Sequence, residues 1–189
     1  MRLYRYFSRF TLIVISFLFL LTFNLNSCKN KIEKKKITYS EKELKEPLIK
    51  ANKHVVKTED QHIIDLIGRY NWPVKETGSG LRYYIYEDGD GQKAEKNNIA
   101  SLNYTLKTIT GDLVYNSKDD GILEFQIGKG QVPGGLEEGI LLLRVGDKAK
   151  FIIPSHLGYG LLGDDNRIPP KATLVYDLEL FQLKEYRKH

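Results

Sequence analysis

Tyr159 and Tyr176 stand near the two ends of the segment GYGLLGDDNRIPPKATLVY, on either side of a polar loop that a double proline ends. A tyrosine ring offers an apolar face, and its hydroxyl can donate one hydrogen bond. The pair can therefore hold a small apolar group and orient a carbonyl beside it. The simpler alternative is that both are half-buried aromatics at strand edges, with their hydroxyls in water.

Other chemistries fit the sequence poorly. The stretch IGKGQVPGG is not a phosphate-binding loop, because Pro133 stands where the glycine pattern needs a glycine and no Lys-Ser/Thr pair follows. Ser155 and His156 are adjacent on an expected strand and point to opposite faces, while the adjacent Glu137 and Glu138 diverge on an expected helix. The four histidines show no metal-ligand spacing, so we expect neither a metal nor a cofactor.

Rotation about an X–Pro peptide bond needs no nucleophile, metal or cofactor. Its barrier is about 18–20 kcal/mol, which makes the uncatalysed reaction slow. The twisted transition state loses amide resonance and part of its charge separation. An apolar pocket with one or two hydrogen-bond donors can therefore bind the twisted form better than the planar one. The aromatic and aliphatic residues around the two tyrosines suit this reaction.

The chain of 189 residues is long enough for one domain with extensions, and its hydrophobic content of 41% is compatible with a packed core. Its formal charge of +5 is unevenly distributed, because residues 1–60 carry a net +7 and residues 61–189 a net −2. The globular part is thus near neutral and lacks the excess of basic residues typical of nucleic-acid-binding domains. We expect no nucleic acid partner.

Residues 1–28 have the layout of a secretory signal, in which Arg2, Arg5 and Arg9 precede the apolar run TLIVISFLFLLTF and LNSC ends at Cys28. Cys28 is the only cysteine, so it cannot form an internal disulfide. LNSC is similar to a bacterial lipobox, which predicts lipidation at Cys28 and a periplasm-facing protein in the cell envelope. An uncleaved membrane anchor is the alternative, because the uncharged stretch approaches the roughly 20 residues of a spanning helix. The lysine after Cys28, in place of an aspartate, slightly favours the outer over the inner membrane.

Residues 29–57 are rich in lysine and glutamate and poor in bulky apolar residues, which predicts a solvated tether. An amphipathic helix is predicted over residues 58–72. Thr58 and Gln61 have the spacing of a capping box at its start, and Pro73 follows its end.

Residues 80–186 change to the period-two alternation of strands, with turns such as DGDG between them. One helical stretch, GLEEGILLLRVGD, interrupts the strands, and Gly146 ends it. This pattern predicts a small α+β domain in which an antiparallel sheet packs on one short helix.

The stretches GQVPGGLEEGILLLRVGDKAKFIIPSHLGYG and IPPKATLVYDLEL resemble the FKBP family of peptidyl-prolyl cis-trans isomerases. The resemblance runs from about Leu81 to Leu183 and implies an antiparallel sheet wrapped around a short α-helix. A lipobox, a basic tether and a helix before the domain are also similar to the lipoprotein FKBPs of Bacteroidetes, including one associated with gliding motility.

The resemblance implies a set of pocket residues by position. Four take catalytic places, with the Tyr159 hydroxyl reaching a substrate carbonyl and Tyr176 contacting the proline ring: Tyr104, Phe125, Tyr159 and Tyr176. Seven take substrate-binding places on the walls, rim and floor: Val114, Tyr115, Leu123, Val132, Pro133, Leu136 and Ile168.

This chain departs from the family pattern at four of these positions. Leu136 replaces the usual floor tryptophan, and Val114 and Tyr115 fall where phenylalanine and aspartate are usual, although a slip of one residue would put Tyr115 in the phenylalanine place. Pro133 replaces an isoleucine whose backbone N–H typically bonds a ligand carbonyl, and proline has no such donor. We expect weaker binding of the family's macrolide inhibitors and an altered or reduced isomerase activity.

The sequence thus predicts a prolyl isomerase that acts on proline-containing segments of exported proteins and assists their folding. A chaperone or peptide-binding module with little turnover, accessory to an envelope machine such as the gliding or secretion apparatus, is the alternative.

Overall fold

The computed structural model describes residues 41–186, with side chains from residue 45 onward. The predicted signal segment, its Cys28 and residues 29–40 of the predicted tether lie outside the described residues. The elements follow one another in this order: α2 (Glu41–Tyr70), β1 (Lys75–Glu76), β2 (Arg82–Glu87), β3 (Ile99–Thr108), β4 (Leu113–Asn116), α3 (Ser117–Asp120), β5 (Leu123–Gln126), α4 (Gly134–Ile140), β6 (Lys148–Ile153), the 3₁₀ turn η2 (Ser155–Leu157) and β7 (Leu174–Lys184).

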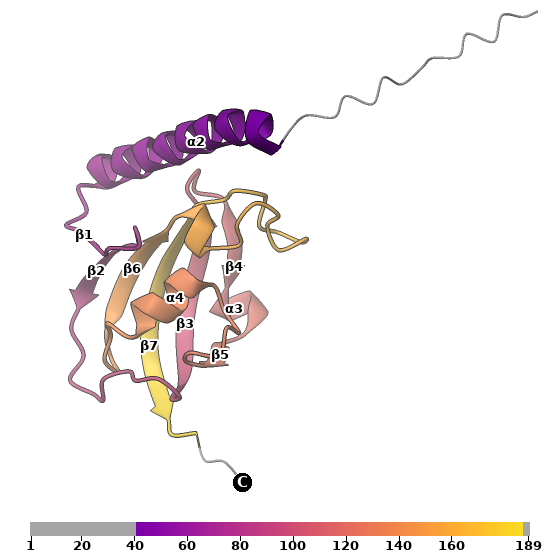
Figure 1. The fold of residues 1–189 in the computed structure, drawn as a ribbon. Coiled ribbons are helices and arrows are strands. Elements are labelled where there is room, and N and C mark those ends of the chain that lie inside the picture. The colour runs from indigo at the N-terminus through magenta and orange to yellow at the C-terminus, as the bar shows by residue number, and fades with distance from the viewer. Residues whose placement is uncertain (1–40, 187–189) are drawn as a thin grey trace, which may run out of the picture. The chain divides into compact units, whose positions relative to one another are not determined.

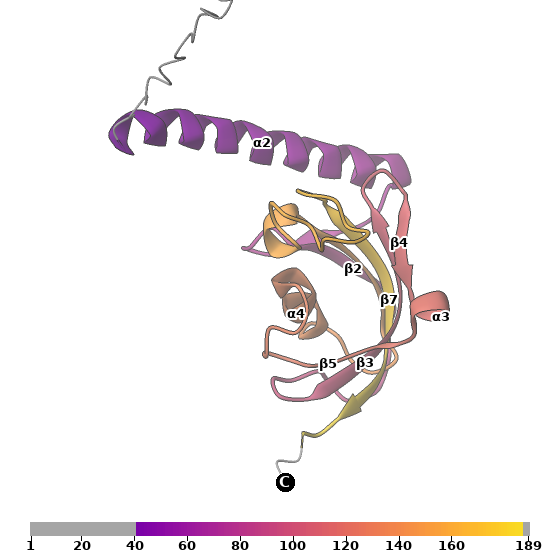
Figure 2. The ribbon, with the colours of Figure 1, turned by 90° about the vertical axis from the view of Figure 1, so that its right-hand side faces the viewer.

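All strand pairs described are antiparallel and form one sheet in the order β1-β2-β6-β7-β3-β4, with β5 paired to the first half of β3. The sheet curves around α4 (Figures 1 and 2). Along β7, Leu174, Tyr176, Leu178 and Leu180 are buried at every second position, so the core lies between α4 and this face of the sheet. The predicted α+β fold is confirmed.

Two glycines one helical turn apart let α4 approach β6 closely. A Cβ atom on Gly139 would lie 2.4 Å from the ring of Phe151, and one on Gly135 would lie 2.5 Å from Ile153. Leu136 and Ile140 on the same helix are completely buried. The helix ends at Ile140, before the predicted stop at Gly146, because the chain continues through turns into β6.

The helix before the domain is longer than predicted, because α2 begins at Glu41 and not at Thr58. Residues 41–57, predicted as a solvated tether, are therefore helical, and residues 45–57 of this stretch are exposed. Thr58 lies inside the helix, where its hydroxyl donates to the His54 carbonyl at 2.9 Å, so the apparent capping box does not mark a helix start. Lysine, glutamate and alanine are strong helix formers, and a charged segment can therefore be helical without a strong apolar pattern.

The second half of α2 is attached to the domain. Ile63 and Leu66 pack with Ile152 of β6 in a small apolar cluster, and Asp60 forms an ion pair with Arg82 of β2. The helix ends at Tyr70, two residues before the predicted end, because Asn71 takes a left-handed conformation with φ of 51°. Among residues 41–186, no helix has both the length and the apolar character that crossing a membrane requires.

Candidate active site

Tyr104 and Tyr176 lie next to each other on the concave face of the sheet. Tyr104 is on β3 and Tyr176 on β7, and their ring centroids are 6.2 Å apart at an interplanar angle of 41°. Tyr176 is only 3% exposed, whereas Tyr104 is half-buried. Tyr176 is therefore part of the core, and Tyr104 presents part of its ring at the surface.

Tyr159 reaches the same place from the β6–β7 connection (residues 154–173). It is 38% exposed, and it is near enough to the other two rings to contribute to raising the pKa values of Tyr104 and Tyr176. Burial is the largest cause of the raised pKa of all three hydroxyls, and Asp164 adds to it at Tyr159. The three hydroxyls therefore stay protonated at neutral pH and keep a proton to donate.

The remaining apolar positions predicted from the sequence belong to the core cluster that contains Tyr176 or pack against it. Three of them are buried in the same core cluster and form the floor, Val114, Phe125 and Leu136, and Ile168 of the β6–β7 connection is buried in the same cluster. Leu123 and Val132 are partly buried and pack against that cluster from the rim. Leu136 is completely buried, so it supports the floor from within the core and presents no surface of its own.

A β-bulge places Val114 and Tyr115 on the same side of the sheet. Leu106 pairs with Tyr115 and Lys107 with Leu113, so that Val114 is an extra residue in β4. Val114 is buried in the core cluster, and Tyr115 packs against it. The two neighbours can both belong to the site even though adjacent strand residues ordinarily point apart.

The Tyr115 hydroxyl is engaged with the β6–β7 connection. It donates to Asp164 Oδ2 at 2.5 Å, and Asn166 Nδ2 donates to it at 3.1 Å. The guanidinium of Arg167 lies over the Tyr115 ring, 4.7 Å from its centroid, and donates to the Val114 carbonyl at 3.1 Å. Tyr115 therefore braces the connection that carries Tyr159. Whether it also contacts a substrate stays a prediction.

Asp164 is a site residue that the sequence analysis missed. Its Oδ1 accepts from the backbone N–H groups of Asn166 at 3.0 Å and Ile168 at 2.7 Å, which closes a turn below the buried Ile168. Burial acts to raise the pKa of this carboxyl, but the Tyr115 hydroxyl and the backbone N–H groups outweigh it and hold the pKa below its usual value. The only signal in the sequence was the run GDDNR, which is typical of a turn and does not identify the acceptor.

Arg167 was also missed. Its guanidinium donates a hydrogen bond to Asp120 Oδ1 at 2.9 Å, and this ion pair joins the connection to α3. The Asn116 side chain caps α3 by accepting from the N–H groups of Lys118 and Asp119, both at 2.9 Å.

Pro133 precedes α4 as its N-terminal flanking residue, with φ of −52°. Its carbonyl accepts from Leu136 N at 2.9 Å and Glu137 N at 3.1 Å, so the residue starts the helix. Because proline has no backbone N–H, position 133 supplies no hydrogen-bond donor at the rim.

Comparison with known proteins decides the family. The family model for FKBP-type peptidyl-prolyl cis-trans isomerases matches residues 90–181. FK506-binding protein 1A of Emericella nidulans is 39% identical over 106 residues, which make up 55% of this chain and 98% of that protein. The chain belongs to the FKBP-type isomerase family.

Bacterial members of the FKBP family are also similar to this chain. A probable isomerase named FkpA from Neisseria meningitidis serogroup B is 39% identical over 111 residues, which are 58% of this chain and 40% of the relative. The chain thus spans well under half the length of that relative. The crystal structure of FkpA from Escherichia coli matches with a TM-score of 0.61 at 28% identity, covering 78% of this chain and 75% of that one.

Proposed function

We propose that this FKBP protein is a peptidyl-prolyl cis-trans isomerase in which a substrate proline binds against Tyr104, Tyr159 and Tyr176. The convergence of three protonated tyrosines over an apolar floor is the observation that carries this proposal. The tyrosines come from two strands and the β6–β7 connection, so the fold brings together residues that lie up to 72 positions apart in the sequence.

The chemistry follows from the geometry. The apolar floor disfavours the charge separation of a planar amide, while the Tyr159 hydroxyl donates to a substrate carbonyl and holds the backbone beside the rotating bond. Tyr159 suits this role because it is the most exposed of the three tyrosines and its hydroxyl stays protonated at neutral pH. Tyr176 contributes its aromatic ring, which contacts the ring of the substrate proline.

The test compares Tyr159→Phe with Tyr186→Phe, a variant of an exposed tyrosine beyond β7. Isomerisation of a panel of X–Pro peptides is followed with the full chain by NMR exchange or a protease-coupled assay. Loss of one transition-state hydrogen bond lowers kcat/KM about tenfold in Tyr159→Phe, mainly through kcat, and Tyr186→Phe keeps the activity of the unmodified chain. Equal activity of both variants would remove Tyr159 from the site.

The clients that we propose are proline-containing segments of exported proteins, whose folding the isomerase assists. The signal-like segment before Cys28 supports export, and lipidation at Cys28 would hold the domain at the membrane on the periplasmic side, with a slight preference for the outer membrane. The FkpA name of the bacterial relatives is compatible with this location. A link to gliding motility rests only on the arrangement of lipobox, basic segment and helix.

A chaperone or peptide-binding role with little turnover is the second candidate. Leu161 and Leu162, beside Tyr159, are 70% and 78% exposed and can contact apolar segments of an unfolded chain. The departures from the family pattern at Val114, Tyr115, Pro133 and Leu136 also support a role with little turnover. Aggregation suppression and proline-limited refolding, measured on one client protein, separate the two roles.

A further inference from the structure

The β6–β7 connection carries Tyr159 and Ile168, and its path decides where the Tyr159 hydroxyl points. Apart from η2, it has no helix or strand of its own. Within it, Gly160 N donates to the Ser155 carbonyl at 2.8 Å, and Lys171 N donates to the Gly160 carbonyl at 2.8 Å. The position of Tyr159 therefore depends on where Ser155 and the end of the connection are held.

A single carboxylate from α2 holds both ends. Glu59 Oε1 accepts from the Ser155 backbone N–H at 2.6 Å and from the Thr173 hydroxyl at 2.6 Å, while Oε2 accepts from the Ser155 hydroxyl at 2.9 Å. Ser155 begins η2 and Thr173 immediately precedes β7. Three hydrogen bonds to one carboxyl group thus bridge the first and last turns of the connection.

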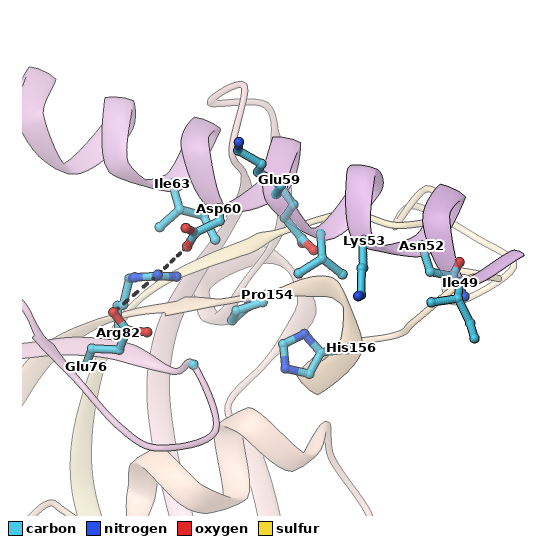
Figure 3. Close-up of a pocket in the computed structure, with 13 residues that line it drawn as sticks. Ile49, Asn52, Lys53, Glu59, Asp60, Ile63, Glu76, Arg82, Pro154 and His156 are labelled. Atoms are coloured by element: carbon cyan, nitrogen blue, oxygen red, sulfur yellow. Dashed lines mark hydrogen bonds and ion pairs between the residues drawn. The ribbon is translucent and has the colours of Figure 1, made fainter. Parts of the chain in front are cut away.

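The helix that supplies Glu59 is fixed by contacts that do not involve the connection. Ile63 and Leu66 are buried against Ile152, and Asp60 pairs with Arg82. Figure 3 shows Glu59 extending from α2 toward the chain at Pro154, beside a groove of about 640 Å³ between the helix and the domain. Because the helix is anchored one turn further on, the carboxylate is held in place before any substrate binds.

We propose that Glu59 is a positioning residue for the isomerase site, which makes α2 a part of the catalytic framework. The hydrogen bonds of Glu59 go to Ser155 and Thr173 and to none of the three tyrosines. It acts through Ser155 and Thr173, which set the separation of the two ends of the connection and so keep Tyr159 facing Tyr104 and Tyr176. This inference rests on the proposed function. It adds to that function a residue outside the part of the chain that the family model matches.

Glu59→Ala in the full chain tests the proposal, with Asp65→Ala as the matched control. Asp65 is an exposed carboxylate on the same helix, and its side chain accepts from Gln61 of α2 at 2.9 Å and not from the connection. When the competent position of Tyr159 is less populated, apparent substrate affinity falls by the same factor. We expect Glu59→Ala to raise KM about tenfold with kcat nearly unchanged, in contrast to the kcat effect of Tyr159→Phe.

A conservative variant and a second measurement complete the design. In Glu59→Gln the amide oxygen still accepts from Ser155 N, so we expect a rise in KM smaller than that of Glu59→Ala. Amide hydrogen exchange follows Gly160 and Lys171, whose N–H groups are bonded inside the connection. If both amides exchange faster in Glu59→Ala but not in Asp65→Ala, the proposal is supported.

Equal KM and equal exchange in Glu59→Ala and Asp65→Ala would overturn the positioning role. If the unmodified chain has no isomerase activity, the proposed function fails, and the exchange comparison alone decides whether Glu59 holds the connection.

Discussion

The floor of the site and the connection above it are held by different forces. At the floor and in the core beneath it, Leu136, Ile140 and Phe151 are completely buried and pack by apolar contact. In the connection, Leu161 and Leu162 point into solvent, and the chain is held by side-chain hydrogen bonds to Asp164 and Glu59. Apolar packing depends on shape over a large area, whereas the connection depends on a few directional bonds. A substitution at the floor should therefore mainly lower the stability of the whole domain, whereas a substitution in the connection should mainly loosen the connection itself.

The largest effect is expected for Gly139→Ala, which breaks the floor. The new Cβ would lie 2.4 Å from the Phe151 ring, so either α4 or β6 must move. Overpacking of this kind costs about 1–3 kcal/mol of unfolding free energy, measured by denaturant titration. Gly134→Ala is the control, because a Cβ there meets no atom within 4 Å. Equal stability of the two variants would show that the close approach of α4 does not limit the fold.

The sequence predicted the floor better than the connection, and the reason is physical. Apolar residues at period two gave the strands, and the family resemblance placed Leu136, Phe125 and Tyr176, because burial leaves a pattern in residue types. Hydrogen bonds that Asp164 and Glu59 accept leave no such pattern in the sequence. A carboxylate in a turn or on a charged helix looks like any solvated one until the fold shows which donors it meets.

The extent of α2 was missed for a related reason. Helix-forming but charged residues before Thr58 have the composition of a tether, and sequence alone does not show that residues 41–57 continue the same helix. The bulge that turns both Val114 and Tyr115 toward the site could also not be predicted from the sequence, because it depends on the pairing register of β3 with β4.

A smaller effect is expected for Asp164→Asn, which loosens the connection and leaves the floor intact. The neutral amide offers one acceptor oxygen in place of two, so it cannot accept from both the Tyr115 hydroxyl and the Ile168 N–H in the present geometry. We expect a loss of about 1 kcal/mol in unfolding free energy and faster amide exchange at Ile168, with exchange at Ile140 changed only as far as global stability falls. Asp165→Asn is the matched control, since asparagine tolerates the φ of 57° at that position. A similar change in both variants would mean that the Asp164 bonds do not hold the connection.

The smallest expected effect is the response of the Asp164 carboxyl to acid, which compares the connection with the floor in the unmodified chain. The pKa of Asp164 in the folded protein lies below its ordinary value of 3.8. The stability contributed by its ionised form is therefore fully present above pH 3.8 and is lost as the pH falls through the lowered folded pKa. In NMR spectra recorded during acid titration, the Ile168 amide signal should stay constant from neutral pH down to about pH 4 and shift below it, before the signals of Leu136 and Ile140 move.

Asp164→Asn should abolish this early shift of the Ile168 signal, because the asparagine side chain does not titrate. A shift of the Ile168 signal centred above pH 4 would contradict the bonding described for Asp164, and simultaneous movement of floor and connection would mean that the two regions respond as one unit.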